Sequence, residues 1–121
     1  MIRRGFRRSV IVHRCEVSLG LYFKLMKKDG KASCSIWIDK TAPVICDLYV
    51  SEESRRKGFA TGMLQLCEQI VKQEGHSEVF LWTAEGSWLV DWYKRKGYTP
   101  TGEILLRPGE SVTNIWLRKE L

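Results

Sequence analysis

The sequence predicts an α/β fold: a mixed, mostly antiparallel sheet with a central parallel pair of strands and helices packed on it. Three observations lead to this prediction. Residues 9–50 contain runs that alternate apolar and polar side chains, as half-buried strands do. From Gly58 the apolar period lengthens to about 3.6, the period of an amphipathic helix. A strand pattern returns at residues 78–83, so the helix should join two parallel neighbours by a right-handed crossover.

The first half of the chain is expected to form an antiparallel meander. Residues 9–17, "SVIVHRCEV", read as a first strand, with Val10 and Val12 on its apolar side and Cys15 as a further candidate for that side. The runs "LYFKLMKK" and "KASCSIWID" flank a DG turn and predict a hairpin. Residues 44–50, "VICDLYV", form the expected fourth strand.

The second half adds two helices and three strands. The long helix should begin near Gly58 and end at Gly75, and residues 78–83 should form a buried strand. A short helix should run from its N-cap, Ser87, to Gly97, and a terminal hairpin, "YTPTGEILL" and "SVTNIWLRKEL", should follow. The apolar face of the long helix comprises Phe59, Ala60, Met63, Leu64, Cys67, Ile70 and Val71, and its polar face comprises Thr61, Gln65, Glu68, Lys72 and Gln73.

Length and composition favour a single domain over residues 1–121. The chain has 121 residues, 44% of them hydrophobic and 11% aromatic, which is typical of a folded protein with one core. No apolar stretch approaches the ~20 residues of a membrane helix, and the basic start lacks the apolar core of a signal peptide. We therefore expect a cytoplasmic protein without membrane contact.

The four cysteines and two histidines are scattered singly, without metal-ligand spacing. The cysteines are therefore expected to be small buried residues of a reduced protein, with neither a disulfide framework nor a metal site. The net charge of +6 and the pI near 9.3 favour an anionic partner: a nucleic acid, a phosphorylated cofactor or an acidic protein surface.

The stretch "SEESRRKGFATGML" places three cations, Arg55, Arg56 and Lys57, at the start of the long helix. A helix N-terminus carries unpaired N–H groups and partial positive charge, so the cations are unfavourable there unless an anion binds. Such an anion would sit on the N–H groups of residues 58–61, and Gly58 would let the backbone approach it. For this stretch taken alone, a solvated cation cluster beside a tight turn is the alternative. GxxxxGK[ST] and GxGxxG are absent, which disfavours a nucleotide triphosphatase and a Rossmann dehydrogenase.

Two motifs together resemble the GNAT superfamily of N-acetyltransferases. "DLYVSEESRRKGFATGML" resembles its acetyl-CoA motif, a strand followed by [Q/R]xxGx[G/A], and "WYKRKGY" resembles its second signature. The ending "NIWLRKEL" resembles the last strand of the family, and the element order agrees from about residue 20 onward. The matching positions are Arg55, Gly58 and Ala60 in the first motif and Tyr93, Gly97 and Tyr98 in the second.

The resemblance implies an enzyme that moves an acetyl group from acetyl-CoA to a primary amine by direct attack in a ternary complex. The backbone of residues 48–50 would pair with the pantetheine arm, and the N–H of Val50 would donate to the oxyanion. Tyr93 would protonate the leaving thiolate, a role open to a phenol that is neutral at pH 7. Packing on the apolar helix face is the alternative for Tyr93. The implied cofactor contacts are Leu48, Tyr49, Val50, Arg55, Arg56, Lys57, Gly58, Phe59, Ala60 and Thr61.

The general base stays open at this point. Asp47 is the carboxylate within residues 44–50, and it could deprotonate the amine directly or through water. A structural ion pair with an arginine or lysine is the alternative for Asp47. Glu85 is a second candidate, with a solvated loop carboxylate as its alternative.

The chain departs from the family pattern in two places. "RCEVSLG" leaves no room for the two helices that the family has between its first two strands, so the acceptor site should be open or completed by a second subunit, as in a homodimer. Gly86 stands where the family often has asparagine, and Ser87 is a candidate to replace that cofactor contact. Trp88 and Trp92, one helical turn apart, are the first places to look for acceptor or dimer contacts.

Two other functions remain as alternatives. One is a non-catalytic CoA-binding module with a GNAT-like fold. The other is a basic nucleic-acid-binding protein, suggested by "RRGFRR" at residues 3–8. The second is disfavoured because aromatic residues do not alternate with those cations as a base-stacking platform requires. The acceptor amine would be a small molecule or a protein, and a polycationic acceptor is disfavoured by the charge of the chain.

Overall fold

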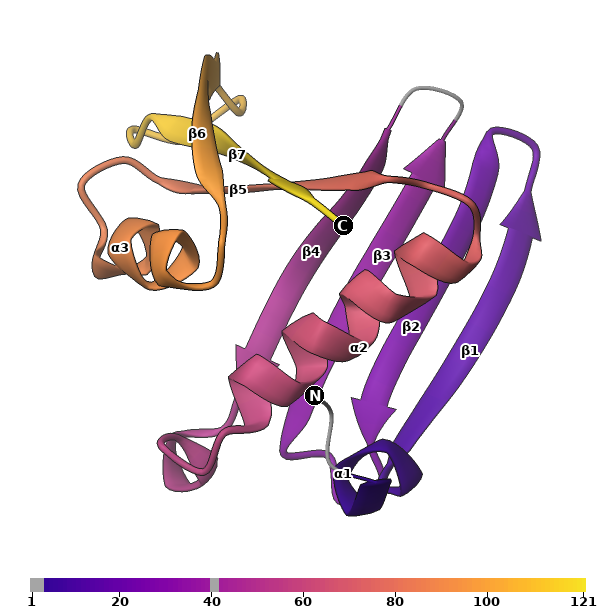
Figure 1. Cartoon of the computed structure of the whole chain (residues 1–121). Helices are drawn as coiled ribbons and strands as arrows, with labels where there is room; N and C mark the ends of the chain where they lie inside the picture. The colour runs from indigo at the N-terminus through magenta and orange to yellow at the C-terminus, as the bar shows by residue number, and fades with distance from the viewer. Residues whose placement is uncertain (1–3, 40–41) are drawn as a thin grey trace.

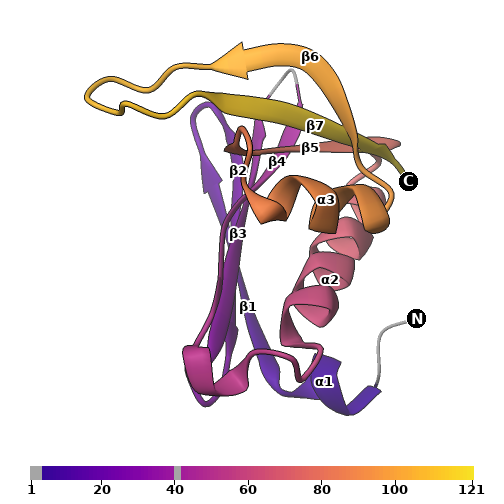
Figure 2. The ribbon, with the colours of Figure 1, turned by 90° about the vertical axis from the view of Figure 1, so that its left-hand side faces the viewer.

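The computed structural model describes residues 4–39 and 42–121, which form one seven-stranded sheet with the order β1-β2-β3-β4-β5-β7-β6. Neighbouring strands are antiparallel except β4 and β5, which are parallel. The described helices lie on one side of the sheet (Figure 2). The predicted α/β fold with a central parallel pair is therefore confirmed. The elements are α1 (Arg4–Arg8), β1 (Val10–Val17), β2 (Gly20–Lys27), β3 (Ala32–Asp39), β4 (Pro43–Val50), the 3₁₀ turn η1 (Glu52–Ser54), α2 (Phe59–Gln73), β5 (Glu78–Ala84), α3 (Trp88–Arg95), β6 (Thr99–Leu105) and β7 (Asn114–Glu120).

The first two strands meet in a tight hairpin. Val17 pairs with Gly20, so only Ser18 and Leu19 connect β1 to β2, and the expected absence of helices between these strands is correct. The next hairpin turns at the predicted DG, where the Lys31 N–H donates to the Asp29 carboxylate at 2.9 Å. Strands β1–β4 thus form an antiparallel meander, against which α1 and α2 pack.

Helix α2 packs its apolar face on β3, β4 and β5 and fills the core (Figure 1). Gly75, with φ 93°, follows the end of the helix as predicted. Glu68, expected on the polar face, is instead buried, because two partners, Tyr98 and Lys119, satisfy its carboxylate. The fully buried core residues include Leu25, Ile36, Met63, Leu64, Leu66, Val71, Val79, Leu81 and Leu117.

Strands β4 and β5 diverge soon after they meet. They share one pair, Val44 with Phe80, and β5 then runs across the sheet at a wide angle to β4 (Figure 1). On its other side β4 has a bulge, where Asp47 and Leu48 face the single residue Cys34 and Asp47 takes φ 54°. The bulge turns Leu48 toward the same core that Ile45 enters.

The edge strand β1 differs from its prediction. Val10 is buried, but Val12 is 42% exposed and Cys15 is exposed, so the expected burial of the latter two is wrong. The reason is position: α2 covers β3 and β4 and leaves β1 at the rim. The short elements α1 and η1 were also not predicted, because neither carries an apolar repeat. No helix in the described part of the chain is long and apolar enough to cross a lipid bilayer.

Candidate functional site

A cleft of about 820 Å³ lies between the end of β4, the start of α2 and the inner face of α3. Ten of the twelve site residues predicted from sequence line it, although they come from three separate elements. These ten are Leu48, Tyr49, Val50, Arg55, Arg56, Gly58, Phe59, Ala60, Thr61 and Tyr93. Ser54, Trp88, Leu89 and Trp92 complete the lining.

The start of α2 has the features of an anion site. Gly58 is the N-cap with φ 80°, it provides no side-chain cap, and the first turn contains no acidic residue. The first intrahelical bond is donated by the Gly62 N–H to the Gly58 carbonyl at 3.0 Å, so the N–H groups of residues 59–61 have no partner within the helix. A Cβ on Gly58 would meet no atom within 4 Å, so the space above this helix end is open.

The loop before α2 holds a buried hydroxyl without a partner. Ser54 is fully buried and lines the cleft, and its Oγ has no hydrogen bond to any described residue. An unpaired buried hydroxyl is costly, so this group is available to a ligand. Arg55 Nε donates to the Val50 carbonyl at 3.4 Å, and Arg56 is exposed with φ 69°. Sequence reasoning missed Ser54, because a serine in a polar loop carries no distinguishing signal.

The free edge of β4 forms one wall of the cleft. Beyond Val44 this strand has no pair with β5, so the cleft-side backbone groups of residues 48–50 have no strand partner there. Such an edge can accept an extended ligand as an added strand. This arrangement is compatible with the role that the sequence suggested for these residues.

Tyr93 faces the cleft from α3. Ser87 caps this helix as predicted, because its hydroxyl accepts from the Leu89 N–H at 3.1 Å, and it is therefore engaged within the helix. Tyr93 is 7% exposed and makes edge contacts with Trp92 and Tyr98, with ring centroids 5.1 and 5.7 Å away. Burial, followed by the nearby Cys34 and Cys67 thiols, raises the pKa of Tyr93 to about 12. Its hydroxyl is therefore protonated at neutral pH.

Three other candidates lie outside this cleft. Asp47 sits on the β4 bulge with its side chain exposed and, within residues 4–39 and 42–121, forms no hydrogen bond or ion pair. Lys57 lines a neighbouring pocket of about 580 Å³ beside α1. Glu85 is exposed in the loop after β5, where its N–H donates to the Thr113 carbonyl at 2.9 Å. The described residues that line the cleft therefore include no carboxylate.

Two buried thiols, Cys34 and Cys67, lie in the core near Tyr93, and the half-buried Cys46 lies on β4. Cys34 Sγ donates to the Cys46 carbonyl at 3.4 Å. Burial, and then the charge of Asp47, raises the pKa of Cys46 to about 11, and burial raises that of Cys67 as well. All four cysteines are free thiols. Thiols held in the protonated form are poor nucleophiles, so the geometry does not favour a covalent acyl-cysteine.

Solved structures share this fold at low sequence identity. The IAA acetyltransferase from Bacillus cereus ATCC 14579 superposes with a TM-score of 0.70 and 16% identity, over 93% of this chain and 100% of the other. A GNAT family acetyltransferase from Elizabethkingia anophelis with acetyl-CoA bound gives 0.69 and 14%, over 93% and 99%. The ribosomal-protein-S18-alanine N-acetyltransferase from Escherichia coli gives 0.68 and 13%, over 87% and 71%. At these identities the likeness is one of fold.

Comparison with functionally curated proteins gives no match. The model of the acetyltransferase (GNAT) family, however, matches residues 15–98, from the first hairpin through α3. The match covers more than half of the chain and includes both motifs that the sequence suggested. Because it encloses the whole cleft and agrees with the fold of the solved acetyltransferases, the chain belongs to the acetyltransferase (GNAT) family.

Proposed function

We propose that this protein is an acetyl-CoA-dependent N-acetyltransferase that acetylates a primary amine by direct attack in a ternary complex. The observation that carries the proposal is that the uncapped, cation-flanked start of α2 opens into the same cleft as Tyr93. An anion-binding helix end would hold the cofactor for thioester aminolysis, and a proton donor would serve the leaving thiolate. The free thiols are compatible with the cytoplasmic location expected from the sequence.

The residues present fit the cofactor. The N–H groups of residues 59–61, with Arg55 and Arg56, would hold the pyrophosphate, and the unpartnered Ser54 hydroxyl is a further donor. The free β4 edge at residues 48–50 would hold the pantetheine arm. When bound, acetyl-CoA supplies a thioester whose carbonyl carbon accepts the amine.

Tyr93 would hold the proton that the leaving thiolate needs. Its raised pKa keeps the hydroxyl protonated at every pH at which the enzyme is expected to work. The N–H of Val50, on the β4 edge, would donate to the oxygen on which charge develops. Neither role requires a nucleophilic side chain.

The charges at the site favour one class of acceptor amine and one candidate for the general base. Because no described carboxylate lines the cleft, nothing there would attract a polycation, and a small amine or a protein amine is the better acceptor. Asp47, exposed and without a partner in the described part of the chain, is the carboxylate that could accept the amine proton, directly or through water.

Calorimetric titration with acetyl-CoA tests the cofactor site. Wild-type protein should bind saturably, and Gly58→Glu should weaken binding by about 100-fold, because a carboxylate would occupy the anion position. Gly109→Glu is a matched control: its φ of 81° is close to the 80° of Gly58, a Cβ there also meets no atom within 4 Å, and it lies in the β6–β7 loop. Absence of binding by the wild type would overturn the proposal.

The lack of a cleft carboxylate also favours a second candidate, a CoA-binding module without catalysis. Turnover of a panel of amines separates the two functions. An enzyme should lose about 10²- to 10⁴-fold in kcat on Tyr93→Phe while its acetyl-CoA affinity stays unchanged. Tight acetyl-CoA binding by wild type and by Tyr93→Phe, with no turnover of any amine by either protein, would favour the module.

A further inference from the structure

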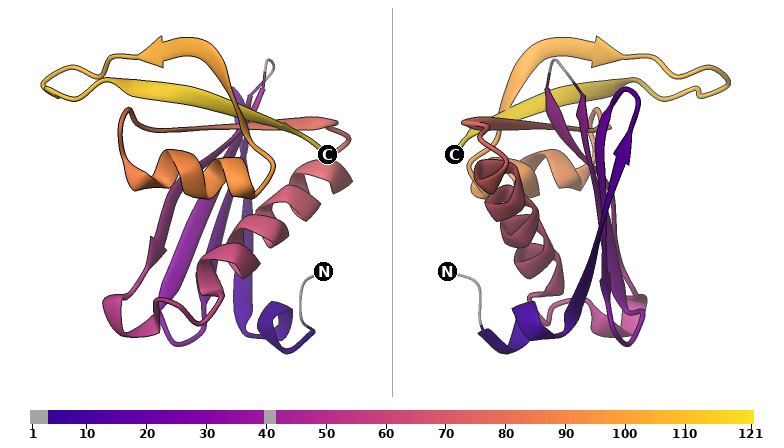
Figure 3. Two further views of the ribbon diagram at one scale, coloured as in Figure 1. Left: turned by 60° about the vertical axis from the view of Figure 1, so that its left-hand side comes forward. Right: turned by 90° about the vertical axis from the view of Figure 1, so that its right-hand side faces the viewer.

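Strand β1 is an edge strand without cover on its outer side. It is the first strand in the sheet order and pairs with β2 through all eight residues in an unbroken register. Within residues 4–39 and 42–121, no element lies outside it (Figure 3, right). A long, regular edge presents a row of free N–H and C=O groups that can pair with another strand.

Exposed apolar residues concentrate at this edge. Among the residues that the structure describes, ten large hydrophobic side chains are exposed, and five of them lie on β1, its turn or the residue paired with it. These five are Ile11 (42% exposed), Val12 (42%), Val17 (42%), Leu19 (69%) and Met26 (41%).

The opposite edge of the sheet is protected. There β6 contains Pro100 and Gly102, and its pairing with β7 shifts between Pro100 and Ile104. Both devices hinder pairing with another strand, and β1 has neither of them.

Charged residues are placed symmetrically along β1. Arg14 and Glu16 lie on the same face as α2, as the 3.8 Å ion pair between Arg14 and Glu74 shows, and they bridge each other at 2.9 Å. Cys15 lies between them and, by strand alternation, on the opposite face. A cation and an anion that flank a central residue form a self-complementary pattern for antiparallel pairing about a twofold axis.

We propose that β1 pairs antiparallel with β1 of a second copy, about a twofold axis through Cys15. Arg14 of each copy then lies opposite Glu16 of the other, and His13 lies opposite Val17. Opposite charges in such positions stabilise a strand pair, and the sheet continues across both copies. An axis through Arg14 would instead oppose two guanidinium groups. An axis through His13 would oppose Glu16 to the apolar Val10.

The proposed register leaves room for the rest of each copy. Residues 13–17 of the two copies overlap, so Val10 and α1 of one copy lie beyond the β1–β2 turn of the other. Helix α2 packs on β3, β4 and β5, and its C-cap residue Glu74 reaches β1 through the 3.8 Å ion pair with Arg14. The inference is independent of the proposed acetyl transfer, because no residue of the cleft takes part.

Sedimentation velocity at increasing protein concentration tests the dimer. Wild type should dimerise reversibly. Arg14→Glu should raise the dissociation constant about 10-fold or more, because the introduced carboxylate of each copy then lies opposite Glu16 of the other. Arg14→Glu/Glu16→Arg should restore the dimer. Arg107→Glu, an exposed arginine of the β6–β7 loop that also has a carboxylate partner, should have no effect. A wild-type monomer up to about 100 µM, or no rescue by the charge swap, would overturn the proposal.

Cross-linking tests the register. The two Cys15 residues would face each other with Cα atoms about 4.5 to 5.5 Å apart, within the range of a disulfide. With diamide added as oxidant, two thiols lose two protons and two electrons to it, and wild type should form a disulfide-linked dimer that Cys15→Ser abolishes.

A cysteine moved two residues along the same face is the control. His13→Cys/Cys15→Ser should not cross-link, because the introduced thiol lies opposite Val17, and adding Val17→Cys should restore the cross-link. Equal cross-linking by wild type and His13→Cys/Cys15→Ser would overturn the register.

Discussion

At the scale of single residues, Glu68 links three parts of the chain that lie far apart in sequence. Its buried carboxylate accepts a 2.7 Å hydrogen bond from Tyr98 and contacts of 3.1 and 3.2 Å from the Lys119 ammonium. The Lys119 ammonium also lies 5.7 Å from the centroid of the Tyr98 ring. The three groups come from α2, the connection between α3 and β6, and β7, so they hold the C-terminal half of the sheet to the central helix.

Lys119→Met should therefore destabilise the protein by about 2 to 4 kcal/mol, because it leaves a buried carboxylate without its counter-charge. Urea unfolding followed by tryptophan fluorescence measures this loss. Glu68→Leu/Lys119→Met, which removes both charges, should lie closer to wild type than Lys119→Met does. A loss no larger than that of Lys94→Met, an exposed lysine of α3, would show that the ion pair does not stabilise the fold.

Ionisation of Tyr93 should make the free energy of unfolding depend on pH in the alkaline range. Its folded pKa of about 12 lies above the ordinary value of 10, so the folded state holds the proton more tightly than the unfolded state. The corresponding stability is fully present below pH 10 and is lost as the pH rises from about 10 to 12. The slope is about 1.4 kcal/mol per pH unit for one such group.

Tyr93→Phe should remove that slope. Between pH 10 and 12 the free energy of unfolding should fall less steeply in the variant than in wild type, by about 1.4 kcal/mol per pH unit. Urea titrations at several pH values measure the difference, and Tyr49→Phe, which alters a half-exposed ring, is the control. Identical slopes in Tyr93→Phe and wild type would contradict the burial of this phenol.

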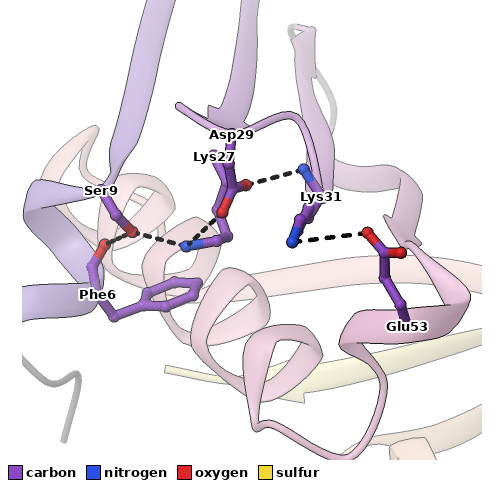
Figure 4. A network of polar contacts seen from close by, with 6 residues as sticks. All are labelled: Phe6, Ser9, Lys27, Asp29, Lys31 and Glu53. Carbon is purple, nitrogen blue, oxygen red and sulfur yellow. Dashed lines mark hydrogen bonds and ion pairs between the residues drawn. The ribbon is translucent and has the colours of Figure 1, made fainter.

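At the scale of elements, the one-turn helix α1 is held by its contacts with β2 and α2. The Lys27 ammonium, buried beneath α1, donates to Ser9 Oγ at 3.2 Å and lies 5.5 and 4.4 Å from the ring centroids of Phe6 and Phe59. Ser9 Oγ in turn donates to the Phe6 carbonyl (Figure 4). On α2, Gly62 leaves room for the Phe6 ring, since a Cβ there would lie 2.7 Å from it.

The effect of Gly62→Ala on the free energy of unfolding should therefore depend on whether Phe6 is present. Alanine favours a helix over glycine by about 1 kcal/mol, but in wild type the new methyl group displaces the Phe6 ring and offsets that gain. In a Phe6→Ala background the same substitution should stabilise the protein by about 1 kcal/mol. A double-mutant cycle from urea unfolding measures the coupling, and equal effects of Gly62→Ala in both backgrounds would show that α1 does not dock as described.

The regular elements could be predicted because local patterns determine them. The 3.6-residue period of α2, the DG turn before β3 and the Ser87 cap of α3 are each local signals, and the structure contains all three. Exposure of β1 and burial of Glu68 depend on where distant elements pack, which no local pattern encodes. For that reason an edge strand was predicted as half-buried and a paired carboxylate as solvent-facing.

The candidate site was predictable where a motif covers it. The motif residues around Gly58 and Tyr93 come together in one cleft because a parallel crossover places the start of α2 near α3. The bulge at Asp47 and the unpartnered hydroxyl of Ser54 were not predictable, since both depend on the path of the backbone.

At the scale of the whole molecule, the sheet consists of two parts that are joined by a single strand pair, Val44 with Phe80, which we call the seam. Strands β1–β4 lie on one side of the single β4–β5 pair, and β5–β7 with α3 lie on the other (Figure 3, left). Helix α2 and the cluster around Glu68 bridge the seam. The cleft opens where the two parts diverge, so a ligand in it would contact both.

Acetyl-CoA should therefore stabilise the molecule as a whole and not one part alone. At about 100 times its dissociation constant it should add about 2.7 kcal/mol to the free energy of unfolding. In hydrogen exchange, residues 45–50, 55–62 and 88–93 should be protected together, because these three segments contain residues that line one cleft. Residues 10–17 at the β1 edge should not respond.

Gly58→Glu should remove the protection and Gly109→Glu should retain it. Protection confined to residues 55–62 would mean that the ligand binds the start of α2 without contacting α3. Tyr93 would then lie too far from the ligand to act as the acid.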